Sequence, residues 1–261
     1  MALRARLAIG ACAALMMGAA SALAQNPPAP QPRNVQPVDR TARRDPRVPD
    51  SVPNISGPWQ TRGYLRRIQP ADGSQTPWLP WSQQAFEKRE AAEKAGSPLF
   101  DPTAACMPSG VPRIIAAPYP IEIIQTPART MILEEVQHLF RVIHMDRKVH
   151  PKGLKPSFMG DSIGHWEGDT LVVDTVGLTE KTQIDEAGDL HTAALHVVER
   201  IHKIDERTLE DLFTIEDSKA FTKPWTARRI FDAKPDLRFI EYICEENNRN
   251  APDANGKLKK F

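Results

Sequence analysis

Strand-length segments of alternating residues run through the second half of this chain, and several carry a charged residue on their apolar face. In Leu195–Ile204, the face that holds Leu195 and Val197 also holds Glu199. Successive side chains of a strand point to opposite faces, so this spacing places Glu199 among residues that line an interior. The pattern predicts a β-structure with charged groups inside it.

Three later segments repeat the arrangement, with a charge between apolar residues of the same face. These charges are Asp211 in Leu209–Asp217, Arg229 in Trp225–Phe231 and Glu241 in Phe239–Ile243. Unpaired buried charges are costly, so such groups are normally paired with one another or retained for a task. Together with Glu199, and with Arg141 from Leu139–Met145, we expect them to form an internal set of carboxylates facing guanidinium groups.

A register shift of one residue would exchange the two faces of Leu195–Ile204. Arg200 would then face inward with His196 and His202, and the interior would be cationic. The apolar content of the two faces favours Glu199 inward only modestly, so both registers stay open at this point.

The order of the predicted elements indicates a barrel. After a short strand candidate in Gln60–Ile68, strand signals follow one another over residues 121–250, with tight connections such as Glu167–Asp169. Such a succession predicts an antiparallel meander, and closing it into a lipocalin-like barrel removes its exposed edges. The fold is therefore expected to be mainly β, with one helix over Gln83–Ala95 and a long Pro-rich loop over Leu99–Pro120.

Residues 1–24 have the pattern of a secretory signal peptide. Arg4 and Arg6 precede an apolar run, and Ala22–Ala24 supplies the small residues for cleavage before Gln25. The apolar run is shorter than the roughly 20 residues that span a bilayer. We therefore expect a periplasmic or secreted protein with no stable membrane insertion after cleavage.

The mature chain divides by composition into four parts. These are a disordered Pro-rich tether (25–53), an N-terminal embellishment with the helix (54–120), the antiparallel β-barrel (121–250) and a flexible tail (251–261). Export leaves Cys106 and Cys244 as the two cysteines of the mature chain. An even pair in an oxidising compartment favours a disulfide, with a catalytic thiol as the alternative.

Charge argues against a nucleic-acid partner. The formal net charge of the whole chain is +1, and removal of Arg4 and Arg6 with the signal peptide changes it to −1. Lys and Arg are interspersed with Asp and Glu, so no basic patch or stripe is expected.

One segment carries a resemblance to known proteins. The run Gly160–Thr175 resembles the signature of a family of exported bacterial proteins, most of them uncharacterised. Four further segments are similar to that family, namely Val149–Pro151, Val198–Arg200, Lys223–Thr226 and Tyr242–Asn247. The resemblance covers residues 54–250 and implies export, but it implies no particular activity.

Two histidines are candidates for catalysis. His150 and His191 lie in predicted loops, where functional groups are often carried, and Asp161 or Asp189 could orient either as a general base. Exposed loop histidines are the alternative interpretation. The seven histidines show no recognised zinc spacing, so neither a metal nor a cofactor is predicted, and a site made of His150, His191 and a carboxylate is only a weaker option.

Trp166 and Trp225 are the aromatic residues expected near the barrel rim. Tryptophan buries a large surface, so each could fill the core or form a wall against which a ligand stacks.

Two classes of function fit these features. The first is an acid/base enzyme, an isomerase, lyase or hydrolase, acting on a small and partly apolar metabolite. The second is a non-catalytic ligand carrier, with a structural envelope protein as a further alternative. The candidate catalytic residues are Glu199, Glu241, Asp211, His150 and His191. The candidate binding residues are Arg229, Arg141, Arg200, Trp166 and Trp225.

Overall fold

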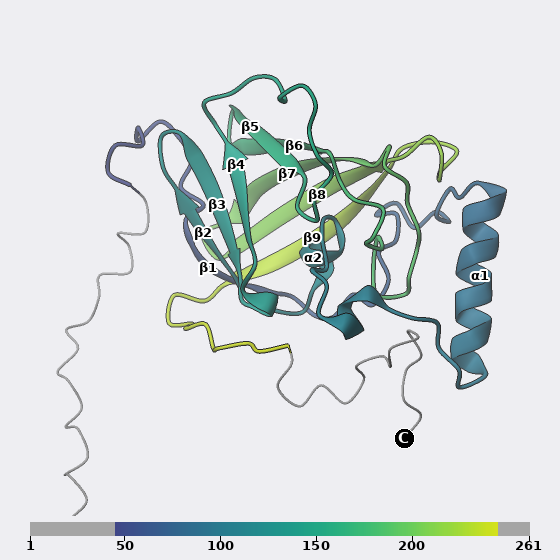
Figure 1. The fold of residues 1–261 in the computed structure, drawn as a ribbon. Coiled ribbons are helices and arrows are strands. Elements are labelled where there is room, and N and C mark those ends of the chain that lie inside the picture. The colour runs from purple at the N-terminus through teal and green to yellow at the C-terminus, as the bar shows by residue number, and fades with distance from the viewer. Residues whose placement is uncertain (1–44, 245–261) are drawn as a thin grey trace, which may run out of the picture. The chain divides into compact units, whose positions relative to one another are not determined.

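Nine β-strands form a closed barrel in the computed structural model, which describes residues 45–244 (Figure 1). The strands are β1 (Gly57–Thr61), β2 (Ile121–Gln125), β3 (Arg129–Glu134), β4 (Phe140–His144), β5 (Asp161–Glu167), β6 (Thr170–Val176), β7 (His196–Asp205), β8 (Thr208–Glu216) and β9 (Trp225–Ala233). Each strand pairs with the next, and β1 pairs with β9. The predicted mainly-β barrel is confirmed.

One strand pair departs from the antiparallel meander. β4 and β5 run parallel and pair only at Ile143 with Ser162 and at His144 with Ile163. Parallel neighbours need a crossover connection, and residues 145–160 supply it. The other pairs around the barrel are antiparallel.

The register of β7 is the one that places Glu199 inside. Val197, Glu199 and Ile201 are buried, whereas Arg200 between them is exposed. Glu199 stands opposite Val173 of β6 and Phe213 of β8, both of which are fully buried. The alternative register, with Arg200 inward, is wrong.

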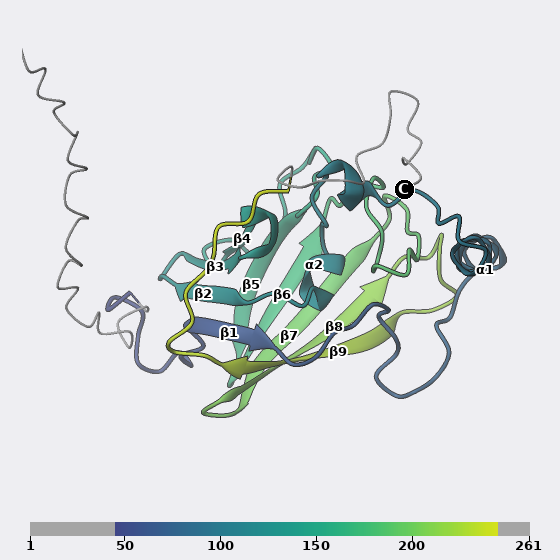
Figure 2. The ribbon, with the colours of Figure 1, turned by 90° about the horizontal axis from the view of Figure 1, so that it is seen from below.

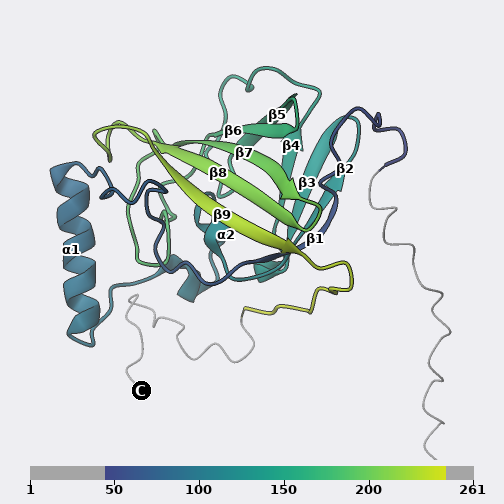
Figure 3. The same cartoon turned by 180° about the vertical axis from the view of Figure 1, so that it is seen from behind.

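The predicted helix lies beside the barrel (Figures 1 and 3). It is α1 (Pro80–Lys94), and it begins earlier than predicted because proline suits the first helical position. Phe86 of this helix stacks on Trp78, with ring centroids 4.9 Å apart. Ser82 Oγ donates to Ala220 O at 2.6 Å, which ties the helix to the β8–β9 connection.

The Pro-rich segment is more regular than predicted. It contains a 3₁₀ helix, η2 (Pro102–Ala105), and the short helix α2 (Arg113–Ala116). Arg113 donates to both carboxylate oxygens of Asp101, at 2.9 and 2.7 Å. Ile114 and Ile115 of α2 are buried and line the barrel interior, and Figure 2 shows α2 within the ring of strands.

The C-terminal segment is not the ninth strand that the alternation of Phe239–Ile243 predicts. Its backbone bonds to side chains near η3 (Val136–His138) instead, with Ile240 N donating to Glu135 Oε2 at 3.0 Å and Tyr242 N to His138 Nε2 at 2.8 Å. The place next to β9 is taken by β1. The barrel therefore begins at residue 57 and not at residue 121.

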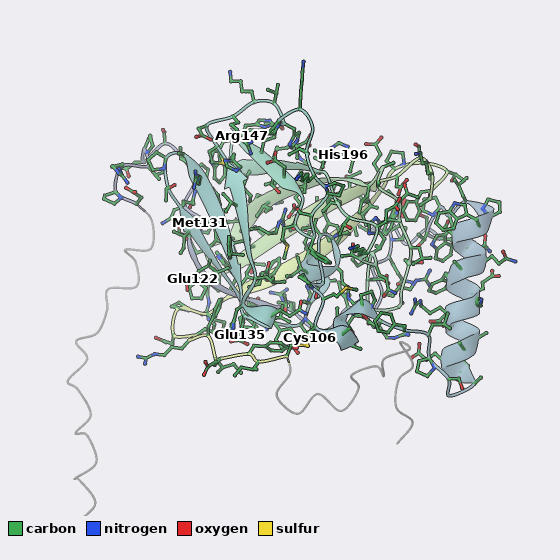
Figure 4. The ribbon with its side chains drawn as sticks, in the orientation of Figure 1. Cys106, Glu122, Met131, Glu135, Arg147 and His196 are labelled. Atoms are coloured by element: carbon green, nitrogen blue, oxygen red, sulfur yellow. A yellow bond between two sulfur atoms is a disulfide. The ribbon has the colours of Figure 1, made fainter. Side chains whose placement is uncertain are left out.

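The predicted disulfide is present between Cys106 and Cys244, with Cα atoms 5.8 Å apart. It joins the segment after η2 to the C-terminal segment, which runs past Glu135 (Figure 4). Because the two cysteines are 138 residues apart in sequence, this bond closes a loop that includes most of the barrel.

The predicted terminal segments fall largely outside the described residues. The signal peptide, residues 25–44 of the tether and the tail lie there. Residues 45–53 are packed on the barrel, because Val48 is buried and Asp45 N donates to Gln125 O at 3.1 Å. Across residues 45–244, no helix has the length and apolar character needed to cross a membrane.

Candidate functional site

Four ionisable side chains meet inside the barrel, one from each of four strands. They are Glu134 of β3, Arg141 of β4, Glu199 of β7 and Asp211 of β8. Each is at most 4% exposed. We call these four residues the interior cluster. The alternation of each strand puts them on the inner face, so the cluster follows directly from the register.

Arg141 and Glu199 form the central ion pair of the interior cluster. The two terminal guanidinium nitrogens of Arg141 donate to the two oxygens of Glu199, at 2.9 and 2.5 Å. This fork-to-fork arrangement is the strongest pairing available to a buried carboxylate. Thr175 Oγ1 accepts a longer bond from Arg141, at 3.4 Å, and its own neighbour is Ser162 Oγ at 2.9 Å.

Burial favours the protonated form of the other two carboxyl groups. Burial raises the pKa of Glu134 to about 8. Burial and the nearby charge of Glu199 also raise the pKa of Asp211, and the two groups are close enough to share a proton. The surroundings of the interior cluster therefore favour one ion pair and two neutral acids.

Three polar atoms of the interior cluster have no hydrogen-bond partner among the described residues. They are Glu134 Oε2, Asp211 Oδ1 and Arg141 Nε. Their residues line a cavity of about 20 Å³ with apolar walls, to which α2 contributes Ile114 and Ile115. A volume of this size accommodates about one water molecule. In this conformation the interior is filled by the protein's own side chains.

Arg229 faces inward but does not join the interior cluster. Its guanidinium donates to backbone carbonyls, at 2.9 Å to Gly63 O and at 3.4 Å to Ala117 O. Burial lowers its pKa to about 10. Arg229 thus ties the segment after β1 to the end of α2, and of the two predicted arginines only Arg141 faces a carboxylate.

His150 lies on the outer side of the barrel in a chain of contacts with acidic residues. Its Nδ1 is 2.7 Å from Asp161 Oδ1, and its Nε2 is 3.0 Å from Asp174 Oδ1. The same Asp174 oxygen is 3.1 Å from His196 Nε2. The predicted His150–Asp161 pair is therefore present, and it holds the β4–β5 connection against β5 and β6. Arg147, labelled in Figure 4, also donates to Asp161, at 2.9 Å.

The remaining predicted acid/base residues are separate from the interior cluster. His191 is buried in a loop, with Nε2 2.8 Å from Thr182 Oγ1 and Nδ1 3.0 Å from Thr192 O, and burial lowers its pKa. Glu241 is exposed on the C-terminal segment, so its predicted interior position is wrong. Within residues 45–244, no three His, Cys, Asp or Glu side chains are arranged to hold a metal ion.

Asp189 belongs to a second buried acidic pair and does not orient His191. Asp185 accepts backbone N–H bonds from Ile68 and Gly188, both at 2.9 Å. Asp189 accepts from Trp78 Nε1 at 2.9 Å, and burial with the neighbouring Asp185 charge raises the pKa of Asp189 to about 8. The pair fastens residues 185–189 to the segment before α1.

The two tryptophans line surface clefts and not the interior cavity. Trp166 is half-buried beside a cleft of about 460 Å³ whose other wall includes Val48 and Met145. Trp225 is buried, packs edge-on against Phe221 with centroids 5.6 Å apart, and borders a smaller cleft of about 310 Å³. Trp225 is therefore mainly a core residue.

Glu134 is the member of the interior cluster that sequence reasoning missed. It stands two residues after Ile132 on the inner face of β3, so the same alternation that identified Glu199 applies to it. Its position at the end of the strand, before Glu135, gives it the appearance of a turn residue. Arg200, by contrast, points outward to Glu167 at 2.9 Å.

The chain was compared with known proteins. No protein-family model and no curated protein matches it, so the family resemblance of Gly160–Thr175 stays a prediction. Among solved structures, it is similar to a secretory abundant heat soluble (SAHS) protein from Ramazzottius varieornatus, at 12% sequence identity over 69% of this chain and 95% of that chain, with a TM-score of 0.27. A likeness at this level indicates nothing about ligands or activity.

Removing one member of the central ion pair should destabilise the fold far more than removing its exposed neighbour. Glu199→Gln removes the carboxylate that holds both terminal nitrogens of Arg141, and a replacement charge requires the buried Asp211 or Glu134 to lose its proton, so we expect the free energy of unfolding to fall by about 3 kcal/mol. Arg200→Gln, one residue away on the outer face, should change it by less than about 1 kcal/mol. Urea unfolding of both variants measures this. Equal losses would contradict the assigned register.

The protonated state of Glu134 should appear in the pH dependence of stability. Between its ordinary pKa of 4.5 in the unfolded chain and about 8 in the folded protein, the folded state binds the extra proton. The free energy of unfolding therefore falls as pH rises through this window. Glutamine does not titrate, so the Glu134→Gln variant should not show this decrease. The free energy of unfolding of the variant minus that of the native protein should therefore be at least about 1.4 kcal/mol larger at pH 8 than at pH 5.

Urea titrations at several pH values measure this difference, and Glu206→Gln is the matched control because the Glu206 side chain is 93% exposed. Asp189 and Asp211 also contribute to the pH dependence of the free energy of unfolding. Because both residues are present in all three proteins, their contribution cancels in the comparison. Parallel curves for Glu134→Gln and the native protein would show that Glu134 is ionised in the folded state.

Proposed function

We propose that this protein binds a small, largely apolar molecule inside its barrel, where the interior cluster contacts the one polar group of the ligand. The supporting observation is the composition of the cavity wall. Apolar side chains surround the two neutral acids and the ion pair, and three buried polar atoms of these residues have no partner within residues 45–244. Ligand pockets are typically apolar with a few polar groups that fix orientation.

Stability alone gives a poor account of the interior cluster. Replacing a buried ion pair by well-packed apolar residues is often neutral or stabilising, and an unpartnered buried carboxyl adds a further cost. Among the described residues, Glu134 Oε2 has no hydrogen-bond partner, and the nearby Arg141 charge lowers the pKa of Glu134 less than burial raises it. A residue of this kind is better explained by a ligand that it contacts.

In this proposal α2 is the cover of the binding site. The cavity of about 20 Å³ is too small for a metabolite, and the buried Ile114 and Ile115 form part of its wall. α2 belongs to no strand ladder, and Arg113 anchors it to Asp101 and, at 3.3 Å, to Gln183. Withdrawal of α2 would enlarge the cavity without breaking a strand pair of the barrel.

Export belongs to the same proposal. The Cys106–Cys244 disulfide supports an oxidising compartment, since disulfides persist in secreted and periplasmic proteins. The signal-peptide pattern of residues 1–24 points the same way. Together they favour a periplasmic or secreted binding protein.

Acid/base catalysis is the second candidate function. Asp211 and Glu199 are placed to share a proton, so one can act as an acid and the other as a base. The raised pKa of Glu134, about 8, keeps a second acid available near neutral pH. An isomerase, lyase or hydrolase acting on the bound molecule could use these groups.

Copurification tests the binding proposal. The full chain, exported and purified without denaturation, should release a small molecule that mass spectrometry detects after unfolding. Glu134→Met removes a carboxyl and keeps the length of the side chain, so it should be at least as stable but retain at least tenfold less of that molecule. Glu206→Gln should retain the native amount.

Binding is contradicted if the native protein releases nothing beyond what an unrelated periplasmic protein, prepared alongside, releases. The two function classes are separated by returning the released molecule to fresh protein. Conversion by native protein and not by Asp211→Asn indicates an enzyme, whereas recovery of the unchanged molecule indicates a carrier.

A further inference from the structure

We propose that the interior cluster selects an uncharged molecule with an oxygen that accepts hydrogen bonds, a carbonyl or hydroxyl compound, over anions or cations of the same shape. This inference rests on the proposed function and identifies the ligand class of the same site. It follows from the donors and charges that the interior cluster leaves available to a ligand.

An anion finds no free positive charge in the cavity. Both terminal nitrogens of Arg141 are occupied by Glu199, at 2.9 and 2.5 Å, so a carboxylate or phosphate would have to displace a buried carboxylate that is already well bound. Arg229, which donates to the carbonyls of Gly63 and Ala117, is not among the residues that line this cavity. A second anion would also lie close to Glu199 and be repelled by it.

A cation is disfavoured for the opposite reason. To neutralise it, Glu134 or Asp211 would have to lose its proton beside the existing negative charge of Glu199. Both carboxyls are almost completely buried, so desolvation opposes the ionisation of either one. The cavity therefore offers an ammonium ion no partner that is already ionised and free.

A neutral oxygen matches the groups that remain. The protonated Glu134 carboxyl and Arg141 Nε–H are donors without partners among the described residues. An acceptor oxygen has lone pairs for two such donors. Asp211 Oδ1 is an unpartnered acceptor and can receive a hydroxyl hydrogen of the same or a neighbouring ligand group.

The remaining walls define the body of the ligand. They consist of apolar side chains from α2 and the strands, among them Ile114, Ile115, Ile123, Ile132, Ile201 and Phe231. Burial of apolar surface against these residues supplies affinity, while the interior cluster supplies discrimination. A compact hydrocarbon ring with one substituent is therefore a suitable probe.

Four probes with one carbon skeleton test the inference: cyclohexanone, cyclohexanol, cyclohexanecarboxylate and cyclohexylammonium. Each is titrated at pH 7 into the full-length protein and into Ile114→Ala/Ile115→Ala, in which two side chains that fill the cavity are trimmed. Ligand-observed NMR gives the affinities. Single Ile114→Ala replaces the double variant if the latter does not fold.

We expect the ketone or the alcohol to bind at least tenfold more tightly than either charged probe. Glu134→Met, combined with the trimmed α2, should abolish that preference, and Glu206→Gln in the same background should retain it. Tighter binding of the carboxylate or the ammonium would overturn the ligand class but leave a binding barrel. If no probe binds either protein, the proposed function fails and the ligand class fails with it.

Discussion

The ion pair between Arg141 and Glu199 organises the interior of this barrel. It connects β4 to β7 between residues 58 positions apart in sequence, and each of its side chains is only 1% exposed. A one-residue shift of either strand would move Arg141 or Glu199 to the other face and leave its partner as an unpaired buried charge. The ion pair therefore favours the observed register of both strands. The protonation of Asp211 and Glu134 follows from the same pair, since Glu199 already holds the one negative charge that Arg141 can balance.

A barrel with such an interior differs from one filled by hydrocarbon. The apolar walls and α2 exclude water, and this raises the cost of each unpartnered polar atom. Two other groups of polar contacts hold loops in place. The contacts of His150 hold the β4–β5 connection. The Asp185–Asp189 pair holds the segment before α1. The interior cluster is distinct because it holds no loop in place.

Much of the barrel could be predicted from the sequence, because strand alternation is a local property. The inner position of Glu199 and Asp211 and the Cys106–Cys244 bond follow from spacing and from cysteine number. Closure by β1 could not be predicted, because five residues with little alternation give no signal of their partner. Phe239–Ile243 shows the converse, a strand-like pattern whose backbone donors are taken by Glu135 and His138.

The candidate site was predictable only in part for a related reason. Alternation shows which face a charge occupies but not where its side chain ends, and so Arg229 was expected to face a carboxylate although it reaches Gly63 O. Glu134 was hidden at a strand end. The role of α2 depends on tertiary contacts of Ile114 and Ile115, which no short pattern in a Pro-rich segment encodes.

We infer that the interior cluster holds one ion pair and two neutral acids. Infrared difference spectroscopy tests it most directly, because a protonated carboxyl has a carbonyl stretch that a carboxylate lacks. At pH 7 the native protein should show this band in the folded state, and Glu134→Gln and Asp211→Asn should each remove part of it. A native spectrum without a protonated-carboxyl band that depends on these two residues would contradict the account.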